Sequence, residues 1–353
     1  MRYLAINLVQ EGMRLGKTIF NEQGVVLINT NTELTRAAID RLELLGYKGL
    51  LIEDELSEGI EYQENFVSNE VRFSLAKKLN NALTLKSDKK TLSNEIDNLQ
   101  SMISELVDDI LSKRELNLNL LELKMFDNYT YFHSVNVAII ALAIAYHLKL
   151  NKADMLTVGT AALFHDIGKL FIGTEILNKP GKLTDEEFEI MKTHSKKGYD
   201  VLSGGNNLSS KITVSVLSHH EHYDGSGYPN GLSGENIILF GRIICIADVY
   251  DALTSDRSYR KGCPVLEAIE YVMANSGTLF DPELVKIFTS RVYPYPVGAS
   301  VLLSNGETGL VIGNSDEVCL RPTLKIISGE ETRIVDLIND SEYRSVVITK
   351  LIQ

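Results

Sequence analysis

Five histidines and two aspartates are spread over a predominantly helical region in the middle of this 353-residue chain. The segments that adjoin His133, His165, His219 and Asp248 are strongly apolar and have helical spacing. An imidazole or a carboxylate is costly to bury there unless it is paired or binds a metal ion. One such histidine alone is more often a satisfied core residue than a ligand. The joint set favours one shared site, and it comprises His133, His165, Asp166, His194, His219, His220 and Asp248.

The donor atoms of this set are imidazole nitrogens and carboxylate oxygens. That combination suits first-row metals such as iron or manganese, and also zinc. The absence of cysteine from the set argues against a structural zinc site. Because His165 and Asp166 are adjacent, the carboxylate can bridge two metal ions, roughly 3.5–4 Å apart, while the imidazole binds one. The residues therefore predict a site for two divalent metal ions.

The same residues occur in an ordered series of motifs, which are HDIGK at 165–169, HHEHYDGSGYP at 219–229, RIICIADVYDALTSDRSYR at 242–260 and GTLFDPELVKIF at 277–288. This series resembles the HD-GYP family of bacterial phosphodiesterases, whose HHE-x-x-DG-x-GYP signature is matched at every defined position. The segment at 176–198 also resembles the family, although Ser195 stands where proline is common. The resemblance covers roughly residues 120–290, and it implies an all-helical domain.

Members of that family hydrolyse cyclic di-GMP at a metal centre. The resemblance implies that the seven residues of the set are metal ligands, with Asp166 as the bridge. In members with three metals, His220 helps to hold the third ion together with a glutamate one helical turn before the first histidine. Here that position is Tyr129. This departure favours two divalent ions, iron or manganese, and makes a third metal site doubtful.

The expected catalytic residues are Asp166 and Lys169. Two divalent cations lower the pKa of a bridging water and so produce a hydroxide that attacks the phosphate. Lys169 follows Asp166 by three residues, and on a helix this places its ammonium on the same face as the metals. The lysine is then well placed to contact a phosphate. The alternative is that Lys169 is a solvent-exposed lysine at the end of a helix, with no role in catalysis.

Three further residues are expected to bind the substrate. Arg257 can clamp a phosphate or pair with guanine, because its guanidinium donates two parallel hydrogen bonds. Tyr228 lies in a Gly-rich loop that permits close backbone approach. Asp224 in the same loop is assigned to substrate binding, or to the orientation of metal-bound histidines together with Asp251 and Glu221.

The resulting hypothesis is a metal-dependent phosphodiesterase that converts cyclic di-GMP to linear pGpG, with slower or absent cleavage onward to GMP. One alternative keeps this chemistry and acts on a different cyclic dinucleotide. Another is a non-catalytic signalling adaptor that binds a cyclic dinucleotide or a protein partner. The presence of every core ligand and of Tyr228 favours the enzyme. The loop that contains the GYP motif at 227–229, called the GYP loop below, is also an interaction surface in the family. A signalling partner is therefore expected there.

The whole chain is predicted to be mainly α, with a central helical domain between two smaller modules. The expected divisions are a small mixed α/β module at 1–70, a helical linker at 71–115, the catalytic domain at 116–291 and a small β-barrel-like module at 292–353. The first module is expected to contain a hairpin at 18–30, a helix at 33–45 ended by Gly46, and then a strand. The last is expected to begin with a hairpin around Asn305 and Gly306.

The linker carries an apolar stripe with a heptad pattern at Leu92, Ile96, Leu99, Ile103, Leu106 and Ile110. This stripe has two interpretations, which are a coiled coil joining two protomers through 92–110, or a helix packed on its own chain. In the central domain, helices are expected at 135–148, at 153–170 and at 188–202. The last of these follows a capping box of Thr184 and Glu187.

The net charge of −12 excludes broad binding to DNA or to anionic membranes, which requires a basic face. Two divalent cations would offset this acidity locally for a small cyclic dinucleotide. Three widely spaced cysteines suggest no disulfide framework, which fits the cytoplasm best. The longest apolar stretch is too short to span a bilayer, and the first residues show no secretory signal. We therefore expect a cytoplasmic protein that binds neither DNA nor membrane.

Overall fold

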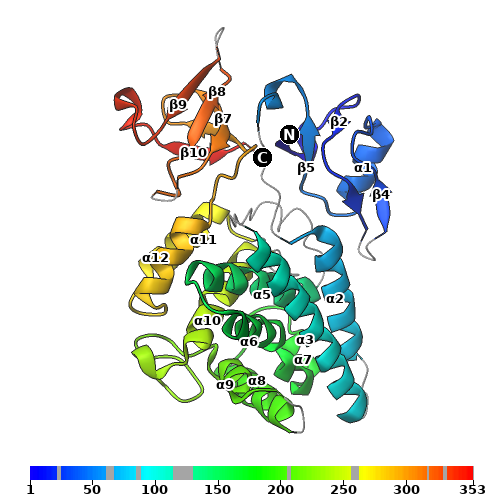
Figure 1. Ribbon diagram of the computed structural model, residues 1–353, viewed down its shortest axis with the longest axis vertical. Helices are drawn as coiled ribbons and strands as arrows, with labels where there is room; N and C mark the ends of the chain where they lie inside the picture. Colours follow the sequence, from blue (N-terminus) through cyan, green and yellow to red (C-terminus); the bar gives the residue numbers. More distant parts are fainter. Residues whose placement is uncertain are drawn as a thin grey trace. The chain divides into compact units, whose positions relative to one another are not determined.

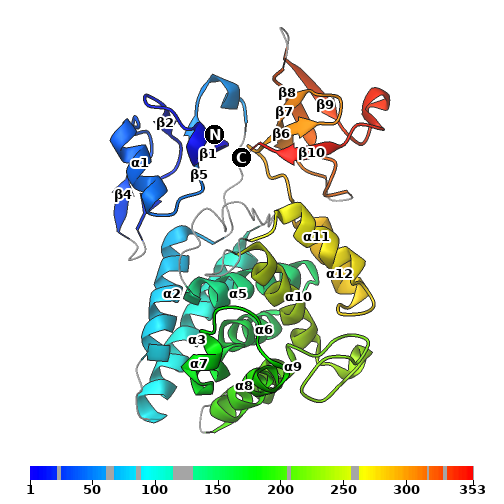
Figure 2. The same cartoon turned by 180° about the vertical axis from the view of Figure 1, so that it is seen from behind.

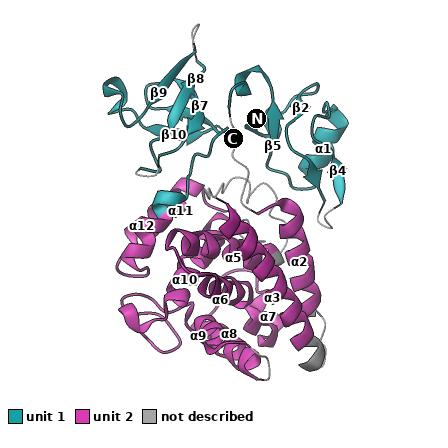
Figure 3. Cartoon of the chain, in the orientation of Figure 1, with its two compact units in different colours: residues 1–66, 117–128, 289–353 teal, residues 67–116, 129–288 magenta. Residues whose placement is uncertain are grey.

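The computed structural model describes residues 1–21, 25–60, 67–84, 89–113, 130–204, 208–255, 262–315, 318–328 and 332–352. These residues form two compact units (Figure 3). Unit 1 contains the described parts of 1–66 and 289–353, and unit 2 contains those of 67–116 and 129–288. Among the described residues, no helix has both the length and the apolar character needed to cross a membrane.

The N-terminal part of unit 1 contains two small antiparallel sheets and one helix. One sheet has the order β1-β5-β2, formed by Arg2–Ala5, Gly49–Glu53 and Arg14–Leu15. The other pairs β3, Ile19–Phe20, with β4, Val26–Ile28, as the hairpin prediction required, although turn residues 22–24 lie outside the described residues. Helix α1, Arg36–Leu44, is followed by Gly46 with a φ of +87°. Strand β5 is the strand expected after Gly46, whereas β1 and β2 were not predicted.

The C-terminal part of unit 1 is a five-stranded antiparallel sheet with the order β10-β6-β7-β8-β9. Its strands are β6 Ser300–Leu303, β7 Thr308–Gly313, β8 Thr323–Ile326, β9 Arg333–Asp336 and β10 Ile348–Leu351. Strands β6 and β7 form the expected hairpin, and Gly306 in its turn has a φ of +88°. The expected C-terminal sheet is therefore present. Its barrel-like closure stays a prediction, because β10 and β9 lie at the two ends of the strand order.

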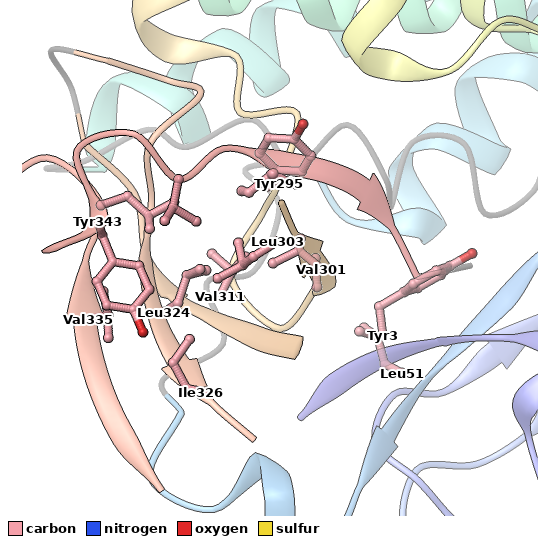
Figure 4. Packing of buried hydrophobic residues seen from close by; sticks show 14 residues of the cluster. Tyr3, Leu51, Tyr295, Val301, Leu303, Val311, Leu324, Ile326, Val335 and Tyr343 are labelled. Carbon is pink, nitrogen blue, oxygen red and sulfur yellow. The ribbon is translucent and has the colours of Figure 1, made fainter. Parts of the chain in front are cut away.

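Residues from both ends of the chain share one apolar core in unit 1 (Figure 4). Tyr3 and Leu51, from β1 and β5, belong to the same cluster of buried side chains as Val301 and Leu324 of the C-terminal sheet. A hydrogen bond from the backbone N–H of Tyr3 to the carbonyl of Gly298, 2.8 Å long, joins the two parts. The two flanking segments therefore contribute to one unit although they are far apart in the sequence.

Unit 2 is helical, and α6 lies among its other helices in both views (Figures 1 and 2). Its helices are α2 Asn69–Thr84, α3 Lys89–Ser112, α5 Thr130–His147, α6 Lys152–Phe164, α7 Thr174–Leu177, α8 Asp185–Ser203, α9 Ser210–Ser218, α10 Leu239–Thr254, α11 Val265–Ala274 and α12 Pro282–Arg291, which begins in this unit. Helix α6 packs against α3, α5, α9 and α10. A Cβ at Gly159 would lie 3.0 Å from atoms of Ile103 and Leu142, so the small residue permits this close packing.

The heptad stripe of α3 is buried within its own chain. Ile96, Leu99, Ile103 and Ile110 have no exposed surface, and Leu106 is 4% exposed. Their helix packs against α2, α5 and α6. The side chain of Leu92 lies outside the described part of the helix. Of the two interpretations of the stripe, the structure therefore favours packing on the same chain over an exposed coiled-coil seam.

The prediction of one helix over 153–170 was wrong at its C-terminal end. Helix α6 ends at Phe164, with His165 as its C-cap, and a 3-10 turn, η3, covers Ile167–Phe171. Gly168 in this turn packs its backbone against α8, since a Cβ there would lie 1.8 Å from the carbonyl oxygen of His194. The tighter turn brings the His-Asp doublet against α8. Helix α8 begins with the expected capping box of Thr184 and Glu187.

Candidate metal centre

All seven predicted side chains lie in unit 2, on or beside five helices. His133 is on α5, and His165 and Asp166 follow α6. His194 is on α8 and Asp248 is on α10. The remaining two, His219 and His220, follow α9 directly. Their ligand atoms form three overlapping groups, each within 4.8 Å, that can hold metal ions: His133, His165 and Asp166; His165, His219 and Asp248; and His194, His219 and His220.

Three of the imidazoles are held by the helices that carry them. The Nδ1–H of each donates to the carbonyl three residues earlier, at 2.7 Å from His165 to Ala162, 2.7 Å from His194 to Met191 and 2.6 Å from His219 to Val216. A carbonyl can only accept, so the proton lies on Nδ1 and the neutral ring presents the lone pair of Nε2. Burial lowers the pKa of His194, and it lowers the pKa of His219 further. The lowered pKa values favour the neutral, metal-binding state of His194 and His219.

Asp166 presents its two oxygens to different histidines. Its Oδ2 lies 3.3 Å from Nε2 of His165 and 3.8 Å from Nε2 of His133. Its Oδ1 lies 3.4 Å from Nε2 of His194. Both Asp166 Oδ1 and His165 Nε2 are buried, and neither has a hydrogen-bond partner among the described residues. Such atoms carry a desolvation penalty that a bound cation would remove, so the residues present fit a divalent metal ion.

His133 is oriented by a second carboxylate. Its Nδ1 lies 2.7 Å from Oδ2 of Asp251, which is fully buried, while its Nε2 lies 3.1 Å from Oδ1 of Asp248. Burial lowers the pKa of His133, but the two aspartates outweigh this and raise it to about 9. Burial opposes ionisation of Asp248 as well, yet its histidine neighbours hold its pKa well below the usual range. A cation bound at Nε2 of His133 would therefore displace a proton.

Lys169 contacts the predicted bridging carboxylate. Its Nζ lies 2.5 Å from Oδ2 of Asp166, and 36% of its side chain is exposed. Burial works against the charge of Asp166, but Lys169 and the neighbouring histidines hold its pKa well below the usual range. Although η3 is not α-helical, the spacing of three residues still brings the two side chains together. The ammonium thus lies between the cluster and solvent.

The GYP loop is anchored beside the cluster by Glu221. This carboxylate is 1% exposed and accepts hydrogen bonds from the backbone N–H groups of Asn230, at 2.7 Å, and Leu232, at 2.9 Å. The ring of Tyr228 stacks on that of His220, with centroids 4.7 Å apart and an angle of 29° between the planes. Burial lowers the pKa of His220 to about 3. Tyr228 therefore lies directly against a predicted ligand.

Two side chains at the edge of the cluster were not singled out from the sequence. Phe188 makes an edge contact with Tyr228, with ring centroids 6.4 Å apart. The Nζ of Lys192 lies over both rings. Both residues are on α8, six and two residues before His194, and this spacing was the only signal for them.

Of Asp224, Arg257 and Tyr129, which were also singled out from the sequence, Asp224 alone lies among the described residues. The hydrogen bonds of Asp224 run to the backbone N–H of Ser226 and, through its own N–H, to the carbonyl of Thr278. Arg257 and Tyr129 lie outside the described residues. Substrate binding by Asp224 and Arg257 therefore stays a prediction.

Comparisons with known proteins find several similar sequences. The chain is 41% identical over 235 residues to "Cyclic di-GMP phosphodiesterase PA4108" of Pseudomonas aeruginosa, covering 65% of this chain and 56% of that protein. It is 38% identical over 205 residues to "Cyclic di-GMP phosphodiesterase" of Thermotoga maritima, covering 58% and 55%. It is also 40% identical over 157 residues to "3'3'-cGAMP-specific phosphodiesterase 3" of Vibrio cholerae, covering 44% and 34%. The chain thus spans about half the length, or less, of these relatives.

A solved structure has the same fold over most of the chain. Bd1817, an HDG"Y"P protein from Bdellovibrio bacteriovorus, aligns with a TM-score of 0.51 at 14% identity, covering 81% of this chain and 97% of that one. The model of the HD domain family matches residues 105–284, just over half of the chain, and this range includes the whole candidate metal centre. The chain therefore belongs to the HD domain family.

Proposed function

We propose that this protein is a metal-dependent phosphodiesterase that hydrolyses cyclic di-GMP to linear pGpG. The main support is the convergence of the Nε2 atoms of His133, His165 and His194 on the oxygens of Asp166 and Asp248. The Nε2 of His219 lies 3.3 Å from that of His194, and buried atoms of this site lack hydrogen-bond partners among the described residues. Relatives that carry the name cyclic di-GMP phosphodiesterase support the choice of substrate. Tyr129 in place of a glutamate favours pGpG over GMP as the product.

Two divalent ions, iron or manganese, fit the mixed imidazole and carboxylate donors best. The ions would be held by His133, His165, Asp166, His194, His219 and Asp248. His220 lies in one group of ligand atoms with His194 and His219. Such ions supply a water of lowered pKa and offset the charge of the phosphate. The oxygens of Asp166 face His133 and His165 on one side and His194 on the other, which supports its role as the bridge.

The protein side chains then bind and orient the substrate. Lys169 would donate to a phosphate oxygen while its contact with Asp166 keeps the ammonium beside the cluster. Tyr228 would line the substrate position next to His220. Hydrolysis adds water across one phosphodiester, so one P–O bond forms, one breaks, and the leaving sugar oxygen takes a proton. Arg257 and Asp224 are proposed to contact the same substrate.

A second candidate function is hydrolysis of a mixed guanine–adenine cyclic dinucleotide. The similarity to a relative named for 3'3'-cGAMP favours it as the nearest alternative. A non-catalytic adaptor is less well supported, because every predicted ligand and Tyr228 is present. The GYP loop would still offer a surface for a signalling partner. A homodimer through 92–110 is not proposed, since the stripe is buried within the chain.

The test is anaerobic purification, metal quantitation and product analysis with a panel of cyclic dinucleotides. We expect about two equivalents of iron or manganese, and pGpG as the main product from cyclic di-GMP. If metal-loaded protein under reducing conditions leaves cyclic di-GMP intact but cleaves another cyclic dinucleotide, the substrate assignment is wrong. If it cleaves none, the enzyme is excluded. We also propose a cytoplasmic location, because three widely spaced cysteines suggest no disulfide framework.

A further inference from the structure

Aromatic rings extend from the candidate metal centre to the protein surface. Tyr228 stacks on His220, and Phe188 meets Tyr228 edge to face with an angle of 82° between the rings. Phe188 is 46% exposed, whereas phenylalanines of the core such as Phe164 and Phe280 are 1% exposed. Exposed apolar side chains are common on protein surfaces, and Phe188 is distinguished from them by its ring contact with Tyr228 beside the cluster. The outer ring therefore presents apolar surface next to the site where a phosphate would bind.

A cation lies over the same rings. The Nζ of Lys192 is 5.0 Å from the ring centroid of Phe188 and 5.8 Å from that of Tyr228. The same ammonium contacts the carboxylate of Glu189 at 2.5 Å, but that side chain is 68% exposed. An ion pair with an exposed partner is weak and exchanges readily. The ammonium can therefore turn to a ligand that lies on the rings without leaving a buried charge.

We propose that Phe188, Tyr228 and Lys192 form a binding site for a purine base of the substrate. This inference rests on the proposed function. A base stacks on aromatic rings, and the O6 and N7 atoms of guanine accept hydrogen bonds from lysine. In a nucleotide the base is joined to the phosphate through one sugar, so a phosphate at the cluster brings its base to the adjacent rim. The aromatic rings begin at His220, within the cluster, and so match that connection.

The site is tested with two probes that both contain a phosphate, of which only one carries a base. The affinities of GMP and of inorganic phosphate for the metal-loaded protein are measured for wild type, Phe188→Ala and Phe188→Tyr. Phe188→Ala should lower the affinity for GMP by about tenfold, because loss of stacking on a base lowers binding affinity by that order. The affinity for phosphate should stay unchanged, and Phe188→Tyr should bind GMP like wild type. Ile190→Ala is the matched control, since Ile190 is 45% exposed on the same helix.

The same variants are then compared in the hydrolysis of cyclic di-GMP. Phe188→Ala should raise KM about tenfold with unchanged metal content, and Lys192→Met should also raise KM. Equal losses of GMP and phosphate affinity, or an unchanged GMP affinity in Phe188→Ala, would overturn the base site. A different result separates the two proposals. If wild type cleaves no cyclic dinucleotide but Phe188→Ala still lowers the affinity for GMP and not for phosphate, the proposed function is wrong and the purine-binding site is supported.

Discussion

Replacement of Asp251 should show how much the orientation of a proposed ligand contributes to metal binding, because Asp251 orients His133 and is not itself a proposed ligand. It touches no proposed metal position, but its buried carboxylate accepts the Nδ1–H of His133 at 2.7 Å and a hydrogen bond from Ser255 at 3.2 Å. The bond to His133 fixes the ring so that Nε2 faces Asp248. Without it the imidazole can rotate or move its proton to Nε2, and either change removes a ligand atom.

The size of the effect follows from the strength of that bond. Hydrogen bonds to charged groups contribute about 1.5–3 kcal/mol, and about 1.4 kcal/mol corresponds to a tenfold change in affinity. Asp251→Ala should therefore weaken Mn²⁺ binding by roughly 10- to 100-fold, the range found for partners of metal-bound histidines. Asp251→Asn should weaken it less, because an amide oxygen still accepts from Nδ1 while the negative charge is lost.

The assay is anaerobic calorimetric titration of metal-free protein with Mn²⁺, alongside hydrolysis of cyclic di-GMP and thermal unfolding. Asp281→Asn is the matched control, since Asp281 is 7% exposed and pairs with Arg242 rather than with a histidine. That variant should lose stability and keep its metal affinity. The reasoning is refuted if Asp251→Ala, still folded, binds Mn²⁺ as tightly as wild type. It is refuted as well if Asp281→Asn weakens Mn²⁺ binding to the same extent.

Three further changes test other parts of the structure. His165→Ala combined with Asp166→Ala should abolish both metal content and pGpG formation, as measured by elemental analysis and chromatography, whereas an adaptor would keep its biological effect. Lys169→Met should lower kcat/KM for cyclic di-GMP by about 100-fold with metal content unchanged, because a donor to the phosphate is lost. Ile103→Ala should lower the free energy of unfolding by about 2–5 kcal/mol, because Ile103 is fully buried. Light scattering should show the same mass as wild type, and dissociation of a dimer would restore the coiled-coil interpretation.

The clustering of the proposed metal ligands was predictable because their chemistry restricts where they can lie. A histidine beside an apolar helical segment needs a partner, and one shared metal site satisfies all five histidines and both aspartates. The structure brings the seven side chains together as this argument requires. The residues that orient or flank them were harder to predict. Asp251 was one of several carboxylates near the motifs, and its selection depends on a distance to His133 across 118 residues of sequence.

The end of α6 shows why a correct motif did not give the correct backbone. The apolar spacing continues after Phe164 and no proline interrupts it, so the pattern predicts a longer helix, although Asp166 and Gly168 are poor helix formers. What ends it is tertiary, since Gly168 must approach the backbone of α8 more closely than any side chain would allow. The short strands β1 and β2 were missed for a related reason. Two to four residues carry too little pattern, and their pairing with β5 comes from distant sequence.

The heptad stripe of α3 was predictable as a buried face, but its packing partner was not. Apolar residues spaced by three and four define one face of a helix, and the same face fits a second protomer or the surface of its own domain. No feature of the α3 sequence distinguishes these two partners, because packing against either one buries the same side chains. The choice depends on whether another helix presents a complementary surface nearer in space. Here α6 does so, and Gly159 leaves room for Ile103, because a Cβ at position 159 would lie only 3.0 Å from an Ile103 methyl group. Burial of an a/d seam is therefore predictable from the sequence of that helix alone, whereas the identity of the partner depends on residues elsewhere in the chain.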